Sequence, residues 1–187
     1  MKLRIISGDL KGRRISLPDR QVTFRPTKDR VRQSLFDIVS DIIPGAFAAD
    51  FCAGSGVFGI ELISRGAAKM HFVECDRLLS QRISVCIGSF GIAEKCRVFE
   101  QDIRVFIRHC SFSYDIIFYD PPYQNEALAD LVPAMVSLLS RNGILLYEYP
   151  GRWKNRPRTT AYPESDRMVV ETRTYGDTAV DVLRKIA

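Results

Sequence analysis

The spacing of apolar and polar positions along this chain changes at about residue 46. From there to residue 149, short apolar runs alternate with stretches in which apolar residues recur every three or four positions. The first pattern predicts buried strands and the second predicts amphipathic helices. The predicted strands are Phe47–Cys52, Lys69–Cys75, Arg97–Glu100, Tyr114–Tyr119 and Ile144–Tyr149. This alternation indicates an α/β, Rossmann-like, doubly wound and mostly parallel sheet with helices on both faces.

Helices are expected in the intervals between these strands. Their apolar stripes lie within Val57–Ser64, Leu78–Phe90, Val105–Cys110 and Leu131–Leu139. Gly66 and Gly91 are typical residues at which a helix stops. Pro133 fits a helix only in its first turn, so the last helix should begin near residue 131.

Two further segments flank the alternating region. Residues 2–7 and 13–17 predict a small N-terminal hairpin, and Thr27 is the expected N-cap of the amphipathic helix that follows it. At the other end, Met168–Tyr175 and Thr178–Arg184 predict an antiparallel pair at the sheet edge. We therefore divide the chain into an N-terminal extension, residues 1–45, and one α/β domain, residues 46–187.

Charge is concentrated at the N-terminal end. Residues 1–32 contain ten lysines and arginines against three aspartates, whereas the whole chain has a net charge of only +5. A basic extension on a nearly neutral domain favours a polyanionic partner such as nucleic acid over a merely solvated surface.

Composition excludes several other classes of protein. No apolar run is long enough to span a membrane, and the N-terminus lacks the apolar core of a signal peptide. The five cysteines form no C-x-x-C pair and only two histidines occur, so we expect reduced cysteines and no metal site. These features predict a cytoplasmic protein that does not contact a membrane. We also expect a monomer.

A glycine-rich turn follows the first strand of the domain. Gly54, Gly56 and Gly59 form G-x-G-x-x-G at the start of a helix, and Glu74 lies 20 residues beyond the first of them, as in dinucleotide-binding proteins. Asp50 precedes the turn, where its carboxylate would repel a pyrophosphate but could bind the loop or a cationic amino-acid group. The turn alone leaves NAD and S-adenosylmethionine open.

Acidic residues end the neighbouring strands. Asp50, Glu74 and Asp102 lie at the carboxyl ends of three successive strands, and these ends line one ligand crevice in such sheets. Asp120-Pro121-Pro122-Tyr123 follows the fourth strand. Its carboxylate and rigid carbonyl can accept both N–H bonds of an exocyclic amine, and its ring can stack on the base. This tetrapeptide favours amino methylation.

Several motifs together resemble a known family. The segments D-F-C-A-G-S-G, V-E-C-D and D-P-P-Y look like those of class I S-adenosylmethionine-dependent amino-methyltransferases. The N-terminal R-I-I-S-G-D-L-K-G-R-R-I and R-P-T-K-D-R-V-R-Q-S-L-F are similar to the RsmD-type bacterial enzymes. The resemblance covers residues 3–150 and implies methylation of a guanine N2 in 16S ribosomal RNA, either free or within an assembling small subunit.

The resemblance also implies roles for individual residues. Target-base and catalytic roles fall on Asp120, Pro121, Pro122 and Tyr123. Cofactor contacts fall on Asp50, Phe51, Cys52, Ala53, Gly54, Ser55, Gly56, Glu74, Cys75, Asp102 and Ile103. In this interpretation the basic extension contacts RNA through Lys11, Arg13, Arg14, Arg25, Arg30 and Arg32.

Three other functions remain open from the sequence. The same tetrapeptide serves an N6-adenine methyltransferase acting on DNA or RNA. The glycine pattern alone also fits a small NAD-dependent oxidoreductase. An RNA-binding module without catalytic activity would keep the basic extension and make no use of Asp120.

Overall fold

The computed structural model describes residues 2–16, 29–123, 125–153 and 168–186, and its centre is one mixed sheet. The strand order is β5-β4-β3-β6-β7-β9-β8, with parallel pairing from β5 to β7 and antiparallel pairing of β9 with both β7 and β8. The strands are β3 Phe47–Phe51, β4 Lys69–Glu74, β5 Cys96–Glu100, β6 Tyr114–Tyr119, β7 Leu139–Pro150, β8 Met168–Tyr175 and β9 Thr178–Lys185. The predicted α/β fold with an antiparallel C-terminal pair is confirmed.

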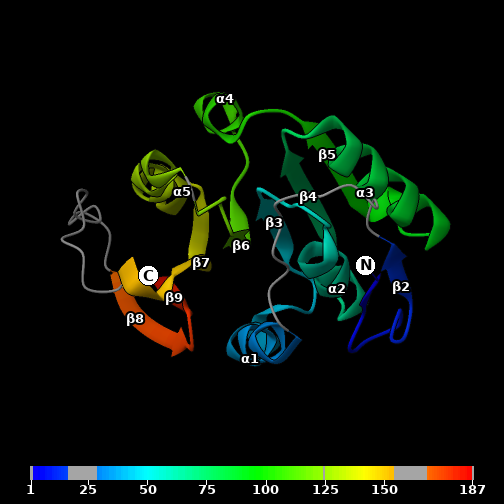
Figure 1. Cartoon of the computed structure of the whole chain (residues 1–187), viewed down its shortest axis with the longest axis horizontal. Helices are drawn as coiled ribbons and strands as arrows, with labels where there is room; N and C mark the ends of the chain where they lie inside the picture. Colours follow the sequence, from blue (N-terminus) through cyan, green and yellow to red (C-terminus); the bar gives the residue numbers. More distant parts are fainter. Residues whose placement is uncertain (1, 17–28, 124, 154–167, 187) are drawn as a thin grey trace.

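Helices cover both faces of this sheet (Figure 1). Apolar side chains of α1, α2 and α3 join one core cluster, and those of α4 and α5 join the cluster on the opposite face. The helices are α1 Asp29–Val39, α2 Val57–Ser64, α3 Arg77–Ser89, α4 Ile103–His109 and α5 Val132–Ser137. Short 3-10 turns lie at η1 Ser40–Ile42, η2 Ala93–Lys95, η3 Glu126–Leu131 and η4 Gly151–Trp153.

The segment between β6 and β7 differs from the sequence prediction. Leu139, expected at the end of a helix, already begins β7 and pairs with Tyr114. Asn142 then adopts a left-handed φ of 66°, and the register shifts before Ile144. The Asn-Gly pair therefore makes an irregularity within the strand instead of a turn before it. Pro133 lies in the first turn of α5, as predicted.

The N-terminal hairpin, β1 Lys2–Arg4 with β2 Arg14–Ser16, packs on α2. Ser64, the last residue of that helix, accepts hydrogen bonds from the amides of Asp9 and Leu10 and donates one to Ser7. A Cβ on Gly8 would lie 1.8 Å from the Ser64 carbonyl oxygen, so only glycine allows this approach. Thr27, the predicted cap of α1, lies outside the described residues.

A buried ion pair attaches α1 to the same helix. Arg32 has 0% exposure and lies 3.4 Å from the fully buried Glu61, which also pairs with Arg65 at 2.7 Å. Arg32 further donates to the carbonyl of Arg4 in β1 at 2.7 Å. The predicted contact of Arg32 with RNA is therefore wrong, because this guanidinium neutralises a carboxylate inside the protein. One acid in an apolar helix thus joins the extension to the domain.

The two hairpins lie at opposite ends of the sheet (Figure 1). The C-terminal hairpin turns at Gly176-Asp177, as predicted, and reaches α1 through a 2.7 Å hydrogen bond between Tyr175 and Ser34. No helix in the described ranges is long and apolar enough to cross a lipid bilayer.

Replacing Glu61 tests whether this ion pair holds the extension to the domain. We expect Glu61→Ala to lower the free energy of unfolding by about 3–5 kcal/mol, because the buried Arg32 guanidinium then keeps only the exposed carboxylate of Asp29, 3.1 Å away, as a counter-charge. Urea unfolding followed by circular dichroism measures the change. Asp37→Ala, on the exposed side of α1, is the control and should change stability by less than about 0.5 kcal/mol. Equal losses in both variants would contradict the role of the pair.

Candidate active site

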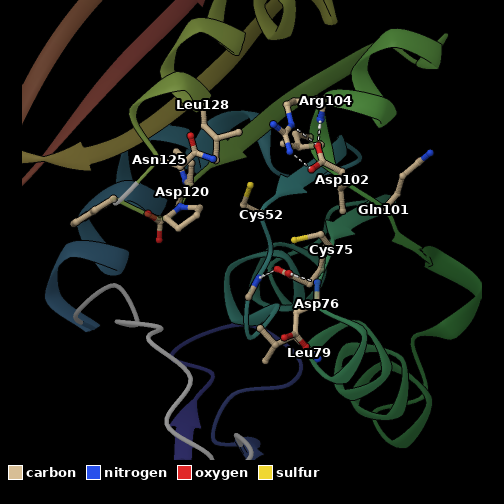
Figure 2. Close-up of a pocket in the computed structure, with 17 residues that line it drawn as sticks. Cys52, Cys75, Asp76, Leu79, Gln101, Asp102, Arg104, Asp120, Asn125 and Leu128 are labelled. Carbon is tan, nitrogen blue, oxygen red and sulfur yellow. Dashed lines mark hydrogen bonds and ion pairs between the residues drawn. The ribbon is translucent and has the colours of Figure 1, made fainter.

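One cavity of about 660 Å³ opens at the carboxyl ends of β3, β4, β5 and β6. Its wall includes all four motif regions that the sequence singled out: the glycine turn, Glu74, Asp102 and the tetrapeptide at Asp120. Figure 2 shows Asp102 and Asp120 on opposite sides, with the side chains of Cys52 and Cys75 between them. The topology therefore brings the predicted site residues of four strands to one cavity.

Buried carboxylates hold the glycine turn in its shape. Glu74 accepts a hydrogen bond from the Gly54 amide at 2.7 Å, and Asp50 accepts one from the Gly59 amide at 3.0 Å. Gly56, with a left-handed φ of 69°, is the N-cap of α2, and a Cβ there would approach Ile83 to 2.8 Å. The turn thus needs glycine for its conformation and the two acids for its amide groups.

The structure separates the residues of the turn into two groups. Cys52 and Gly54 line the cavity. Other residues predicted to contact the cofactor are buried and do not line it: Asp50, Phe51, Ala53, Ser55 and Gly56. Burial raises the pKa of Asp50 well above its usual range, although the Gly59 amide acts in the opposite direction. The sequence left two roles open for Asp50: binding the loop or binding a cationic amino-acid group. Its hydrogen bond and burial fit the first role.

Glu74 connects two loops at the edge of the sheet. Its second carboxylate oxygen accepts from the Asp76 amide at 2.8 Å, while Asp76 in turn caps α3 by accepting from the amides of Leu78 and Leu79. Asp76 and Leu79 also line the cavity. Sequence reasoning missed these two residues, although Asp76 follows Glu74 closely and precedes a helix, which is a recognisable capping signal.

Asp102 occupies the start of α4 and pairs with Arg104. Its carboxylate accepts from the Arg104 amide at 2.8 Å and from the Arg104 guanidinium at 2.9 and 2.6 Å (Figure 2). These hydrogen bonds from Arg104 lower the pKa of Asp102 to about 2. Arg104, which lines the cavity, was not predicted, because its relation to Asp102 arises from the geometry of the helix start. Ile103 and Cys75 line the cavity as predicted.

Asp120, Pro121, Pro122 and Tyr123 form the opposite wall. Burial, followed by the charges of Glu148 and Asp50, raises the pKa of Asp120 well above its usual range. The Tyr123 hydroxyl donates to Glu148 at 3.3 Å. Glu148 lies in β7 and has 3% exposure. Sequence reasoning missed Glu148; the only signal was a single acid in an otherwise apolar strand.

The basic residues of the extension do not all lie near this cavity. Arg13 stacks on Phe90, which follows α3, and the neighbouring Leu10 is bonded to the end of α2. These helix ends lie at the amino edge of the sheet, since the helices run antiparallel to the parallel strands. Lys11, Arg13, Arg14 and Arg30 are exposed, and Arg25 lies outside the described residues. Contacts of these residues with RNA stay a prediction.

Two glutamates at the same level of the sheet allow a matched test of the glycine-turn support. Glu74→Ala should weaken S-adenosylmethionine binding by about 10- to 100-fold, because the Gly54 and Asp76 amides lose a charged acceptor. Isothermal titration calorimetry measures the change. Glu100, the β5 residue that pairs with Glu74, is exposed, and Glu100→Ala should keep the wild-type affinity. Unchanged affinity in Glu74→Ala would contradict this role.

Comparison with known proteins gives the family. Residues 3–184 match the family described as Conserved hypothetical protein 95. The chain is 35% identical over 147 residues to Ribosomal RNA small subunit methyltransferase D of Escherichia coli, covering 79% of this chain and 71% of that protein. It is 30% identical over 190 residues to a Bacillus subtilis protein named "Putative rRNA methyltransferase YlbH", covering 98% and 99% of the two chains.

A solved structure agrees with these matches. The Escherichia coli protein titled "Putative methyltransferase yhhF" superposes with a TM-score of 0.86 at 26% identity, covering 100% of this chain and 99% of that one. The predicted methyltransferase and its cofactor are confirmed, and the NAD-dependent oxidoreductase is not supported. The chain belongs to the ribosomal RNA small subunit methyltransferase D family, whose chemistry depends on S-adenosylmethionine.

Proposed function

We propose that this protein transfers a methyl group from S-adenosylmethionine to the exocyclic N2 amine of a guanine in small-subunit ribosomal RNA. The observation that carries the proposal is the single cavity whose wall includes both the glycine turn and Asp120–Tyr123. A cofactor held at the first feature and a base held at the second would meet inside it. The name of the Escherichia coli relative supports small-subunit ribosomal RNA as the substrate.

The cavity suits the proposed cofactor in size and charge. Its volume of about 660 Å³ falls within the range of small-molecule sites, roughly 300–1,000 Å³. Four carboxylates line it against one guanidinium: Glu74, Asp76, Asp102 and Asp120 against Arg104. This balance favours a cationic ligand over a pyrophosphate. When bound, S-adenosylmethionine supplies an activated methyl group on a sulfonium sulfur.

Residues of the chain would hold the cofactor at three points. Glu74, the last residue of β4, would accept hydrogen bonds from ribose hydroxyls. Asp102, which follows β5, would accept one from the adenine amine. Cys52 and Gly54 line the remaining part of the cavity and would contact the methionine part of S-adenosylmethionine.

The tetrapeptide would orient the target amine. Asp120 and the Pro121 carbonyl would each accept a hydrogen bond from one of its two N–H groups, which turns the nitrogen lone pair out of conjugation with the ring. The Tyr123 ring stacks on the base and fixes its plane. The nitrogen lone pair would form the new N–C bond while the bond between the methyl carbon and the sulfonium sulfur breaks, its electron pair staying on sulfur as a neutral thioether, and the amine proton would pass to Asp120. The raised pKa of this carboxyl suits it to accept a proton.

The target guanine must leave its stack to reach this pocket, at a general cost of a few kcal/mol. Exposed arginines and lysines of the extension would offset that cost through phosphate contacts. Residues at the amino edge of the sheet, such as Lys11 and Arg13, would contact RNA away from the target, so the RNA-binding surface would extend across the molecule.

Asp120→Ala tests the proposed chemistry. We expect it to lower methyl transfer by more than about 100-fold while S-adenosylmethionine affinity stays close to wild type, because the glycine turn is untouched. The assay compares purified small-subunit RNA with partially assembled subunits, followed by nucleoside analysis. Glu171→Ala, on exposed β8, is the control. N6-methyladenine as the sole product would refute the guanine assignment, and full activity without Asp120 would refute the mechanism.

The pH dependence gives a second test. Asp120 must be ionised to accept the amine, and its pKa is raised by burial and by Glu148. Activity should therefore fall as the pH falls through this raised pKa, at a higher pH than for an ordinary carboxyl group. Asp120→Asn keeps an oxygen acceptor but cannot take up the proton. Its slower rate of methyl transfer should therefore not fall as the pH is lowered. If the activity of Asp120→Asn still falls at low pH, the titrating group is another residue.

A further inference from the structure

One cation lies in the wall of the acidic cavity. Arg104, in the first turn of α4, is the single lysine or arginine among the described residues that line it, and the acids of the same wall are Glu74, Asp76, Asp102 and Asp120. A guanidinium at this position opposes the sulfonium charge of S-adenosylmethionine. Charge attraction to the cofactor therefore does not account for the arginine, whereas its hydrogen-bond donors can.

The Arg104 side chain is held by Asp102. Its Nε and Nη2 donate to the two oxygens of that carboxylate at 2.9 and 2.6 Å, and its backbone amide donates to the same carboxylate at 2.8 Å (Figure 2). A bidentate pair of this kind brings guanidinium and carboxylate into roughly one plane. Both side chains line the cavity and stay accessible, with exposures of 56% for Arg104 and 37% for Asp102.

Each member of the pair has capacity for a further hydrogen bond. A guanidinium has five N–H donors, and the bonds to Asp102 use two of them. A carboxylate has about four acceptor positions, and Arg104 fills three. The pair can therefore offer an acceptor and a neighbouring donor, in one plane, to a ligand in the cavity.

Adenine has the complementary edge. Its 6-amine is a donor, and an acceptor nitrogen of the ring lies on either side of it, N1 on one side and N7 on the other. Asparagine and glutamine bind adenine in DNA in this way, with an acceptor on the amine and a donor on N7. A carboxylate alone can bind only the amine. The pair can bind the amine and a ring nitrogen together, which distinguishes adenine from bases that lack this combination.

We propose that Arg104 is a cofactor-binding residue whose guanidinium donates a hydrogen bond to N1 or N7 of the adenine while Asp102 accepts one from the 6-amine. The inference rests on the position that the proposed function gives to the adenine, and it adds a second contact there. Because Asp102 neutralises the guanidinium, the donor can lie in the cavity with little repulsion of the sulfonium.

The test uses S-adenosylhomocysteine and its 1-deazaadenine and 7-deazaadenine analogues. All three have a neutral sulfur, and each analogue replaces one ring nitrogen by C–H. Isothermal titration calorimetry with the full-length protein measures the dissociation constants. We expect one of the two analogues to bind the wild type about 10-fold or more weakly than S-adenosylhomocysteine, because a charged donor loses its acceptor.

Arg104→Ala should bind S-adenosylhomocysteine about 10-fold more weakly and should bind that analogue with the same affinity to within about twofold, because the group that contacts the ring nitrogen is gone. S-Adenosylmethionine should also bind this variant more weakly, although the loss of a cation would by charge alone strengthen the binding of a sulfonium.

Arg108→Ala is the matched control. Arg108 lies one turn further along α4, is exposed and does not line the cavity. Its charge adds to the effect of the Arg104 hydrogen bonds in lowering the pKa of Asp102, so its removal makes the same change of charge near the site. We expect Arg108→Ala to keep the wild-type affinities for all three ligands to within about twofold.

The outcomes separate this inference from the proposed function. Equal affinity of the wild type for the three ligands would overturn the inference. So would an analogue penalty that persists in Arg104→Ala, because another donor would then bind the nitrogen and Arg104 would only orient Asp102. Wild-type cofactor affinity in Arg104→Ala, with weaker binding of small-subunit RNA, would assign the guanidinium to a phosphate instead.

An Asp102→Ala variant tests the position of the adenine itself. If it binds S-adenosylhomocysteine as well as the wild type does, the adenine does not lie at Asp102, and that part of the proposed function is refuted together with the inference. The titrations with these ligands contain no RNA, so the identity of the methylated base does not affect them.

Discussion

The arrangement of the active site depends on backbone amides held by buried carboxylates. The chain reverses from β3 into α2 through a glycine turn that exposes N–H groups, and an unpaired buried amide is costly. Asp50 and Glu74 accept two of these groups from adjacent strands. Because Glu74 also holds the Asp76 amide, one acid fixes the starts of both α2 and α3 at the rim of the cavity.

The helix that begins at this turn also attaches the N-terminal extension. α2 has only eight residues, and all of them are buried. Its last turn carries Glu61 and Ser64, which bind α1 through Arg32 and the N-terminal hairpin through Leu10. The extension, proposed to contact RNA, and the turn, proposed to hold the cofactor, are thus connected through a rigid element about 12 Å long by the standard helical rise.

The C-terminal hairpin supports the other side of the site. β9 inserts between β7 and β8, and its buried Asp181 accepts hydrogen bonds from Tyr149 and Thr172 on those two strands. The strand that carries Glu148 is therefore held on both edges, by β6 and by β9. A chain segment that carries no recognisable motif contributes to the position of Tyr123 through this packing.

Local sequence was sufficient for most of the fold and for the location of the site. Periodicity predicted α2 and β6 with the observed bounds, because these segments are mostly apolar and end at clear glycine, acid or proline signals. The motif acids ended the predicted strands, so a parallel sheet had to bring them to one edge. The family resemblance then identified the methyl donor.

Only the tertiary structure decided what each charged group faces. Arg32 was expected to contact RNA, yet it is buried beside Glu61 of another helix. Asp50 and Glu148 likewise had neighbours that spacing along the chain does not specify. Periodicity reports which side of an element is apolar, whereas the partner of a buried charge depends on which elements pack together, and the sheet order determines that.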